Sequence, residues 1–515
     1  MRKKIASVIL ATMLTVLTLA GCGNSSSGSA GDAGSAASNT TEAAESASEQ
    51  DKVLKDGKKD VITIVFPGNS SQPADLAAVQ QELNVIAEDV VDCDIQVQIL
   101  EWGVFSEQAN LMLSSGEDVD ILFNWSVQSS ALSGQIYDIT DLVDSYAPEA
   151  KALMNQYIQA CYIDGRLYGF PSYHEFANRS GLVCRTDILE ELNVDPASIT
   201  TWDDVDALLA IVHEQYPELY VLVPANTGSG MLDSMNLGVF DLIQNSMVGV
   251  YTDGRDGATA HNIYDTDEFR EVAERAYAWN KAGYFLPDST TNTDTRQTYL
   301  KAGSCFGYIG TVHPGTKTQE SINAGVDVTT IPITHQGSGT SNVATFQYTI
   351  PTGSSTPEKA LAVLNLMYSN PAFQNLIHYG VEGKDYVVVS DGVAGYPDGV
   401  DSSNVGWTNE VWLTGNAPIG LAWQTDPEGI WESYREFNDG ANFAPSYGFS
   451  FDYSSVKNQV TAVQNVLDKY TALIYSGMSD PAESLDAFYK ELDAAGIQDL
   501  VDTAQKQLDE WSQAQ

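Results

Sequence analysis

Few residues of this chain are spaced for catalysis. Two of its six histidines are followed by glutamate, as at the start of the zinc-protease motif H-E-x-x-H. The second histidine of that motif is replaced by Asn178 after His174-Glu175 and by Pro217 after His213-Glu214. The sequence also lacks a G-x-S-x-G nucleophile elbow, a G-x-x-x-x-G-K-[ST] phosphate loop and the EF-hand spacing. We therefore predict that the protein is not an enzyme and holds no catalytic residue, metal or cofactor.

Aromatic and amide side chains gather instead in turn-rich stretches. Trp412 and Trp423 flank Thr414-Gly415-Asn416, a poor environment for regular core packing. Flat aromatic faces stack on the apolar faces of sugar rings, and amides and carboxylates bond sugar hydroxyls. A small-molecule site is expected to combine such apolar walls with a few polar groups. This inventory favours binding of a sugar.

The start of the chain carries an export signal. Arg2-Lys3-Lys4 precedes the apolar run 5–19, which ends in Leu19-Ala20-Gly21-Cys22. A basic segment, an apolar segment and small residues before the cleavage point are typical of a secretory signal. The run is also shorter than the ~20 residues of a membrane-spanning helix. A cysteine directly after Leu-Ala-Gly resembles the signal of bacterial lipoproteins, which implies removal of residues 1–21 and acylation of Cys22.

The composition favours an acidic, folded protein outside the cytoplasm. Hydrophobic residues make up 43% of the 515 residues, enough for a large core. The formal net charge of -44 repels nucleic acid and anionic lipid, so a neutral or cationic ligand is favoured. Besides Cys22 there are four cysteines, and none of them forms a C-x-x-C pair. They could form disulfides or remain as buried reduced thiols, and the sequence does not decide between the two. The four cysteines are Cys93, Cys161, Cys184 and Cys305.

A low-complexity segment separates the signal from the folded body. Residues 23 to about 60 are rich in Ser, Ala, Gly, Thr and Glu and contain almost no large apolar residue. Such a segment buries too little surface to offset its ordering entropy. We therefore expect residues 22–60 to form a flexible linker that begins with the lipidated Cys22.

The folded part begins with alternating strands and helices. The β-branched runs 61–66, 95–100 and 119–123 predict strands, and residues 74–90 predict a helix between the first two. This alternation is typical of βαβ units and a parallel sheet. Ligands of such sheets bind beyond the carboxyl ends of the strands, where Trp125 lies.

Three further stretches carry a resemblance to a known family. Residues 168–173, followed by 181–187, resemble the first crossing between lobes in the extracellular solute-binding proteins of bacterial ABC importers. This large family includes maltose- and oligosaccharide-binding proteins, and residues 375–386 are also similar to it. Residues 448–511 resemble the C-terminal domain of its LipO/LplA-like lipoprotein subgroup.

The resemblance implies an α/β fold of the type II periplasmic-binding-protein class. Two lobes, joined by hinge crossings, close over a ligand like a clamp, and closure is a population shift driven by the ligand. We expect an N-terminal lobe of residues 61–170 plus 306–370. We expect a C-terminal lobe of residues 175–305 plus 371–515.

The predicted function is that of a lipid-anchored substrate-binding protein. It would capture an extracellular solute, best an oligosaccharide, and deliver it to ABC permease subunits on separate chains. We expect a monomer on the outer face of the cell membrane, attached only through its lipid and without nucleic acid. The predicted ligand-binding residues come from the first strand edges, the first crossing and the Gly/Asn-rich segment. They are Trp125, Tyr173, Glu175, Trp412, Asn416 and Trp423.

Alternatives from other classes remain. A peptide or amino acid is the second choice of ligand for the same kind of importer protein. A surface glycosidase or lyase would need two converging carboxylates, which leave no readable spacing in a sequence. An adhesive lipoprotein would bind no small solute and usually shows repeats, which this sequence lacks.

Overall fold

The computed structural model describes residues 50–226, 230–244 and 246–514. The predicted signal, Cys22 and the first part of the predicted linker lie outside these residues. The prediction of a flexible linker is wrong for residues 50–60. Leu54 is buried in the first hydrophobic core. Lys359 Nζ lies 2.8 Å from Asp56 Oδ1 and 2.7 Å from Asp60 Oδ2, so one apolar residue and one buried cation anchor this polar segment.

The first sheet has the strand order β2-β1-β3-β15-β6. The strand β1 is parallel to β2 and to β3, as the alternation of strands and helices predicts, whereas β15 joins β3 antiparallel. The loops after the three parallel strands therefore meet at one edge of the sheet. The strands are β1 (Asp60–Gly68), β2 (Cys93–Glu101), β3 (Ile121–Asn124), β6 (Gly169–Phe170) and β15 (Gln347–Thr349).

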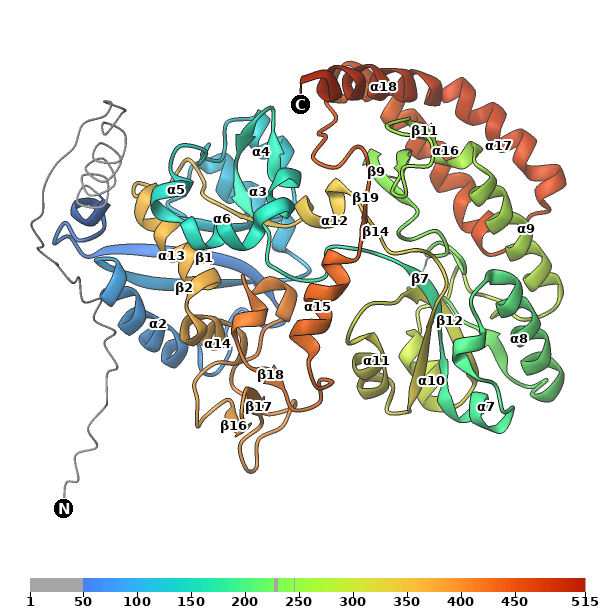
Figure 1. Cartoon of the computed structure of the whole chain (residues 1–515), viewed down its shortest axis with the longest axis horizontal. Helices are drawn as coiled ribbons and strands as arrows, with labels where there is room; N and C mark the ends of the chain where they lie inside the picture. The colour runs from blue at the N-terminus through green and yellow to red at the C-terminus, as the bar shows by residue number, and fades with distance from the viewer. Residues whose placement is uncertain (1–49, 227–229, 245, 515) are drawn as a thin grey trace, which may run out of the picture. The chain divides into compact units, whose positions relative to one another are not determined.

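Helices from three parts of the chain cover the first sheet (Figure 1). α2 (Leu76–Val90) and α3 (Phe105–Ser115) connect its parallel strands. Shorter helices come next in the sequence. They are followed by a hairpin of two short strands, β4 (Tyr162–Ile163) and β5 (Arg166–Leu167). The shorter helices are α4 (Val127–Leu132), α5 (Val143–Tyr146), α6 (Pro148–Met154) and η1 (Asn155–Cys161).

A late segment of the chain also packs in the first core. The predicted lobes had placed this segment, which begins at residue 371, in the second lobe. Phe373 and Ile377 of α14 (Pro371–Tyr379) are buried in that core, next to α13 (Pro357–Ser369). Trp407 and Leu413 are buried there too. The apolar face of α14 packs against α2, so this segment belongs with the first sheet rather than with the second lobe.

The second sheet has the strand order β13-β7-β12-β8, and its members also depart from the prediction. β12 (Cys305–Thr311) and β13 (Val328–Pro332) both pair antiparallel with β7 (Ser180–Arg185), and β8 (Tyr220–Leu222) is parallel to β12. Residues 306–332 were expected in the first lobe. They belong to the second because Ile309 and Ile331 bury their side chains in its core.

Helices precede and follow the strands of the second sheet in the sequence. We call this sheet with its helices the second lobe, and the first sheet with its helices the first lobe. The helices of the second lobe are α7 (Thr186–Glu191), η2 (Pro196–Ser198), α8 (Trp202–Gln215), η3 (Ile263–Asp265), α9 (Asp267–Lys281), α10 (Arg296–Ala302) and α11 (Thr316–Ala324).

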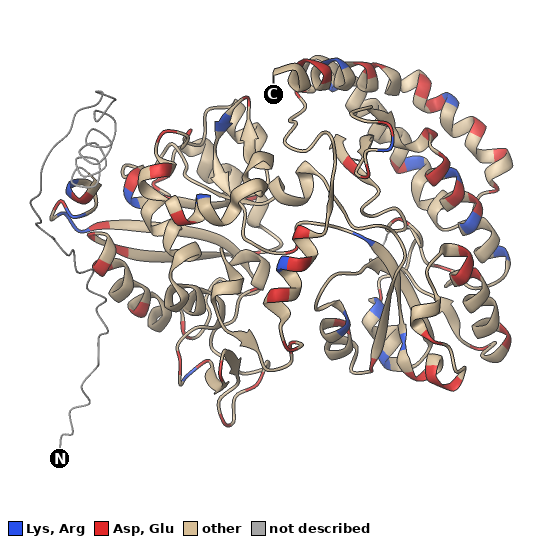
Figure 2. Ribbon diagram, in the orientation of Figure 1, with Lys and Arg blue, Asp and Glu red and all other residues tan. Residues whose placement is uncertain are grey.

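Three long helices end the chain and build a third core. α16 (Lys457–Tyr475), α17 (Pro481–Ala495) and α18 (Ile497–Ala514) pack together, and α16 and α17 lie beside α9, as Figure 1 shows in red and green. Phe488, Leu492 and Leu500 bury their side chains between them. Acidic residues are spread over the outer surfaces of these helices (Figure 2). A three-stranded sheet completes the core, with β9 (Phe240–Gln244), β10 (Val248–Tyr251) and β11 (His261–Asn262).

Three segments cross between the lobes near one another. The first runs through Asn178, whose backbone bridges Gly337 of the second. β14 (Gly337–Ser338) of the second pairs in parallel with β19 (Asn442–Phe443) of the third. The third crossing runs through β19 rather than at 370–371, where the predicted lobe boundaries place it. It is held by Asn438, whose Oδ1 accepts from the backbone N of Phe176 at 2.7 Å.

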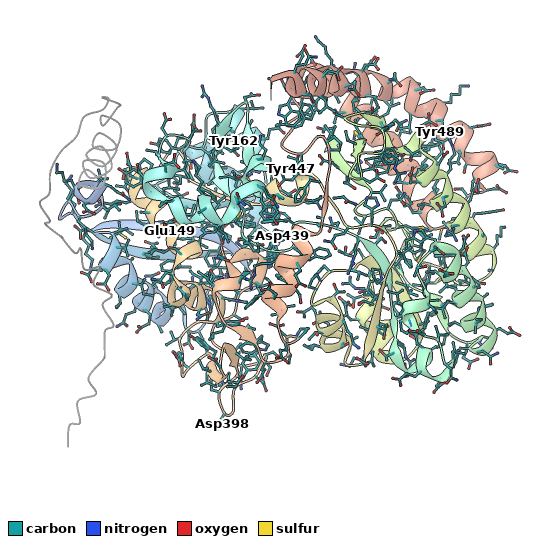
Figure 3. All side chains as sticks on the ribbon, viewed as in Figure 1. Glu149, Tyr162, Asp398, Asp439, Tyr447 and Tyr489 are labelled. Carbon is teal, nitrogen blue, oxygen red and sulfur yellow. The ribbon has the colours of Figure 1, made fainter. Side chains whose placement is uncertain are left out.

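Further side chains fix the crossings. Tyr157 Oη donates to Asp439 Oδ1 at 2.8 Å, and Tyr447 Oη donates to the carbonyl of Tyr157 at 3.1 Å. Asp439 and Tyr447 are labelled in Figure 3. The buried carboxylate of Asp241 accepts from the backbone N of Thr340 at 3.0 Å and from Ser446 Oγ at 2.6 Å. It thus ties the second crossing to the third.

The four cysteines in the described residues are buried free thiols, so they form no disulfide with one another. Burial raises the pKa of Cys93 and of Cys305 to about 12, which keeps both thiols protonated and unreactive. Among the described helices, none has the length and apolar character needed to cross a membrane.

Candidate functional site

Three tryptophans are stacked at the carboxyl edge of the first sheet. Trp102 follows β2, Trp125 follows β3, and Trp412 lies in η4 (Val411–Leu413). The ring centroid of Trp102 lies 5.8 Å from that of Trp125 and 5.6 Å from that of Trp412. The interplanar angles are 18° and 29°. Trp102 is therefore stacked with both of its neighbours, and we call these three residues the tryptophan floor.

Buried aromatic rings support the tryptophan floor. The ring centroid of Phe123 on β3 lies 6.3 Å from that of Trp125 and 6.1 Å from that of Trp412. Phe346, which precedes β15, lies 5.4 Å from Trp412. Phe123 is fully buried, whereas Trp125 keeps 36% of its surface exposed and the other two tryptophans are half-buried. The floor is thus held in place and still offers apolar surface to a ligand.

The loop that carries Trp125 is fixed by a buried amide. Asn124 Oδ1 accepts from the backbone N of Ser126 at 2.7 Å, which closes a tight turn around Trp125. Asn124 Nδ2 donates to Ser130 Oγ at 3.2 Å and so ties the turn to α4. The tryptophan side chain is therefore presented on an ordered turn.

Tyr173 and Asn416, predicted as ligand contacts, are almost completely buried. The backbone N of Tyr173 donates to the carbonyl of Gly415 at 2.5 Å, and its ring packs edge-on against Phe176. Asn416 Nδ2 donates to the carbonyl of Tyr368 at 3.0 Å. Tyr173 thus joins the loop after Trp412 to the first crossing, and the Asn416 side chain joins this loop to α13.

Trp423, also predicted as a ligand contact, lies in another aromatic group. It belongs to β18 (Ala422–Trp423), which forms a small sheet with β16 (Val387–Ser390) and β17 (Val393–Gly395). Its ring stacks on Tyr379 at 5.2 Å and meets Tyr396 edge-on at 4.7 Å. These contacts do not connect Trp423 to the tryptophan floor, within the part of the chain that the structure describes.

A polar pocket of about 170 Å³ lies on the second lobe, at the carboxyl ends of β8 and β12. Arg296 donates through Nη2 to Glu320 Oε1 at 2.7 Å and through Nη1 to the carbonyl of Ala225 at 2.5 Å. The guanidinium carbon lies 4.9 Å from the ring centroid of Tyr308. Because Arg296 neutralises Glu320, this pair adds no net charge to the pocket.

Glu175, the last predicted contact, faces this pocket from the first crossing. Its Oε1 lies 3.5 Å from Nε2 of His313, which lines the pocket just after β12. α15 (Ile430–Asp439) lies close by, since Ile430 and Tyr434 approach Gly315, which follows His313. Burial, with the nearby charge of Glu175, raises the pKa of Tyr434 well above its usual range, so the phenol stays neutral.

Some site residues were not among the predicted contacts. Trp102 follows a strand just as Trp125 does, and the same rule places it at this edge, although only Trp125 was chosen as a contact. His313 and Glu320 gave no sequence signal, because the pairing of β12 with β7 is what places them in the second lobe, next to Arg296. No group of three or more His, Cys, Asp or Glu side chains suited to a metal ion occurs among residues 50–226, 230–244 and 246–514.

Comparison with known families identifies this class of protein. Residues 68–372 match the family described as bacterial extracellular solute-binding protein. The match spans more than half of the chain, so the chain belongs to this family. Residues 445–513 match a domain of unknown function, DUF3502, which covers α16–α18. The predicted family and its separate C-terminal domain are confirmed, and the family is one of extracytoplasmic transport proteins.

Individual relatives agree with this assignment. The chain is 26% identical over 477 residues to a "Carbohydrate ABC transporter substrate-binding protein" of Streptococcus pneumoniae serotype 4 (strain ATCC BAA-334 / TIGR4), covering 89% of this chain and 92% of that protein.

Solved structures show the same fold. The N-glycan transport solute binding protein NgtS from Streptococcus pneumoniae superimposes with a TM-score of 0.79 at 24% identity, over 88% of this chain and 99% of that chain. The same protein in complex with Man5GlcNAc gives a TM-score of 0.68 at 24% identity, over 89% and 99%. An extracellular solute-binding protein from Bifidobacterium longum subsp. infantis gives 0.64 at 18% identity, over 88% and 99%. These likenesses confirm the predicted two-lobe type II fold.

Proposed function

We propose that this solute-binding protein captures a neutral oligosaccharide outside the cell and delivers it unchanged to an ABC permease. The tryptophan floor carries the proposal. Three stacked indoles at a sheet edge form an extended apolar surface, and one of them keeps 36% of its surface exposed. Such a surface suits the apolar faces of several linked sugar rings better than the backbone of a peptide.

Electrostatics support a neutral ligand. The formal charge of the chain is -44, which repels anionic sugars such as uronates. The Arg296 guanidinium, a cation of the second-lobe pocket, is already bonded to Glu320. Hydroxyl groups, which carry no charge, are the ligand groups that fit this environment.

The relatives support the sugar class. A relative that shares 26% of its residues with this chain is named as a carbohydrate substrate-binding protein, and a structure of the same fold holds Man5GlcNAc. We extend this chemistry to the present chain and choose Man5GlcNAc as the first probe.

The proposal includes attachment to the membrane. Cys22 would carry the lipid, so that a monomer acts on the outer face of the cell membrane beside separate permease and ATPase chains. The Cys22→Ala chain is expected to incorporate no labelled fatty acid and to appear in the medium. Incorporation of label at the wild-type level would contradict the anchor and leave the sugar proposal untouched.

A ligand screen by thermal shift tests the proposed binding. Residues 23–515 are heated with neutral oligosaccharides, uronate oligosaccharides and peptides, and the product mixture is analysed afterwards. A bound neutral oligosaccharide raises the melting temperature as its concentration exceeds Kd, and it is recovered intact. Stabilisation by peptides alone would favour a peptide-binding protein. Cleaved sugar, lost when a carboxylate of the site is replaced, would make the protein an enzyme.

A further inference from the structure

The hydrogen bonding of His313 fixes which of its ring nitrogens can accept. His313 Nδ1 lies 2.8 Å from the carbonyl oxygen of Pro314. A carbonyl only accepts, so Nδ1 carries the proton. When the ring carries this one proton only, Nε2 is an acceptor. This nitrogen faces Glu175.

Glu175 and His313 therefore oppose one another as two acceptors. Glu175 Oε1 lies 3.5 Å from Nε2, at the outer limit of a hydrogen bond. Glu175 Oε2 is buried and has no hydrogen-bond partner among the described residues. Buried polar atoms without partners are rare in folded proteins and call for an explanation. Both groups lack a donor, and hydroxyl groups of a ligand are donors of the right kind.

The adjoining pocket limits what can reach these acceptors. Its volume of about 170 Å³ is smaller than the 300–1,000 Å³ that is typical for a whole drug-sized ligand. It therefore suits one sugar ring rather than an oligosaccharide. The hydroxyl-bearing side chains of Ser234, Thr311 and Thr316 line the pocket beside His313. These groups form a polar surface, in contrast to the apolar tryptophan floor.

We infer that Glu175 and His313 determine specificity by accepting hydrogen bonds from two hydroxyls of one sugar ring seated in the second-lobe pocket. This inference rests on the proposed function. Other rings of the same oligosaccharide stack on the tryptophan floor. A ligand that contacts both the first lobe and His313 binds the closed form of the protein better than the open form. This difference in affinity is what shifts the protein towards its closed form.

The replacement Glu175→Gln separates a ligand contact from a structural role. The new amide donates to His313 Nε2 and leaves a neutral carbonyl oxygen in place of the carboxylate. The ligand therefore loses the nitrogen acceptor and the charge of the other acceptor, while the unliganded chain keeps its stability. We expect the melting temperature without ligand to stay equal or to rise. We expect the affinity for Man5GlcNAc to fall roughly ten- to hundredfold, since hydrogen bonds to charged groups are among the stronger ones.

Calorimetry on residues 23–515 with Man5GlcNAc tests the inference. Glu175→Gln and His313→Asn are compared with His261→Asn, the matched control, whose His261 forms a contact with Asp256 away from this pocket. Both pocket variants should lose affinity, and both should discriminate less than wild type against Man5GlcNAc analogues that lack one mannose hydroxyl. Wild-type affinity in the two pocket variants, with binding lost in Trp102→Ala, would overturn this inference and leave the proposed function standing. A wild-type chain that binds peptides and no sugar of the screen would overturn both.

Discussion

The tryptophan floor and the second-lobe pocket differ in almost every physical property. The floor consists of three stacked indoles backed by Phe123 and Phe346. The pocket is lined by hydroxyl groups, an arginine–glutamate pair and His313, and Glu175 faces His313 from the first crossing. An apolar surface binds through area removed from water and tolerates different sugars. A polar pocket with unsatisfied acceptors rejects ligands that lack the matching donors. The first lobe would thus supply affinity and the second lobe selectivity.

The largest expected effect concerns the stability of the polar pocket. The Glu320 side chain is only 7% exposed and is paired with Arg296. Arg296→Met would leave this carboxylate buried without its cation, which costs about 3–5 kcal/mol of unfolding free energy. Chemical denaturation measures this loss. Arg255→Met is the control, since Arg255 pairs with Asp253 on a more exposed surface and should cost at most about 1 kcal/mol. Equal losses would show that the pocket pair is not special.

The second prediction addresses the apolar floor. Trp102 is stacked with both other tryptophans, so Trp102→Ala removes the centre of the surface. We expect the affinity for Man5GlcNAc to fall on the order of a hundredfold by calorimetry. Trp202→Ala, a half-buried tryptophan that packs on the second core, controls for general destabilisation. An unchanged affinity in Trp102→Ala would remove the floor from the binding site.

The third prediction separates stability from binding within the first lobe. Asp385 is 1% exposed, and burial together with nearby Asp75 raises its pKa to about 6. The folded pKa lies above the unfolded value of 3.8, so this stabilising contribution is complete below pH 3.8 and is lost as the pH rises through 6. Asp385→Asn should therefore be more stable than wild type at pH 8, by roughly 2–3 kcal/mol, and should lose this advantage at pH 4. Denaturation at both pH values measures the difference. An advantage that does not depend on pH would contradict the assignment.

The smallest expected effect is that of Trp423. Its ring contacts lie with Tyr379 and Tyr396, outside the tryptophan floor. Trp423→Ala should weaken binding less than tenfold, and much less than Trp102→Ala, in the same calorimetric titration. A loss as large as that of Trp102→Ala would extend the site to β18 and would support the original prediction for this residue.

The sequence was informative where local pattern decides structure. The β-branched runs predicted β1, β2 and β3, and the position of Trp125 after β3 predicted that it lies at the sheet edge. The lobe boundaries could not be predicted in the same way. Only the long-range partners of β12, β13 and α14 decide in which lobe each one packs.

Side-chain direction limited the prediction of the site. Tyr173 and Asn416 lie in the predicted segments, but their side chains turn into the first core, which the residue types do not reveal. Glu175 was selected for its place in the first crossing, yet its acceptor partner His313 lies 138 positions further along the chain. That pairing depends on the antiparallel register of β12 with β7.

A crystal structure of residues 23–515 with Man5GlcNAc tests the central claim most directly. The account predicts one oligosaccharide in contact with both regions. One ring should stack on Trp102 or Trp125, and another ring should place hydroxyl oxygens within hydrogen-bond distance of the Glu175 carboxylate and of His313 Nε2. Sugar density that touches neither the tryptophan floor nor the Glu175–His313 pair would contradict the account.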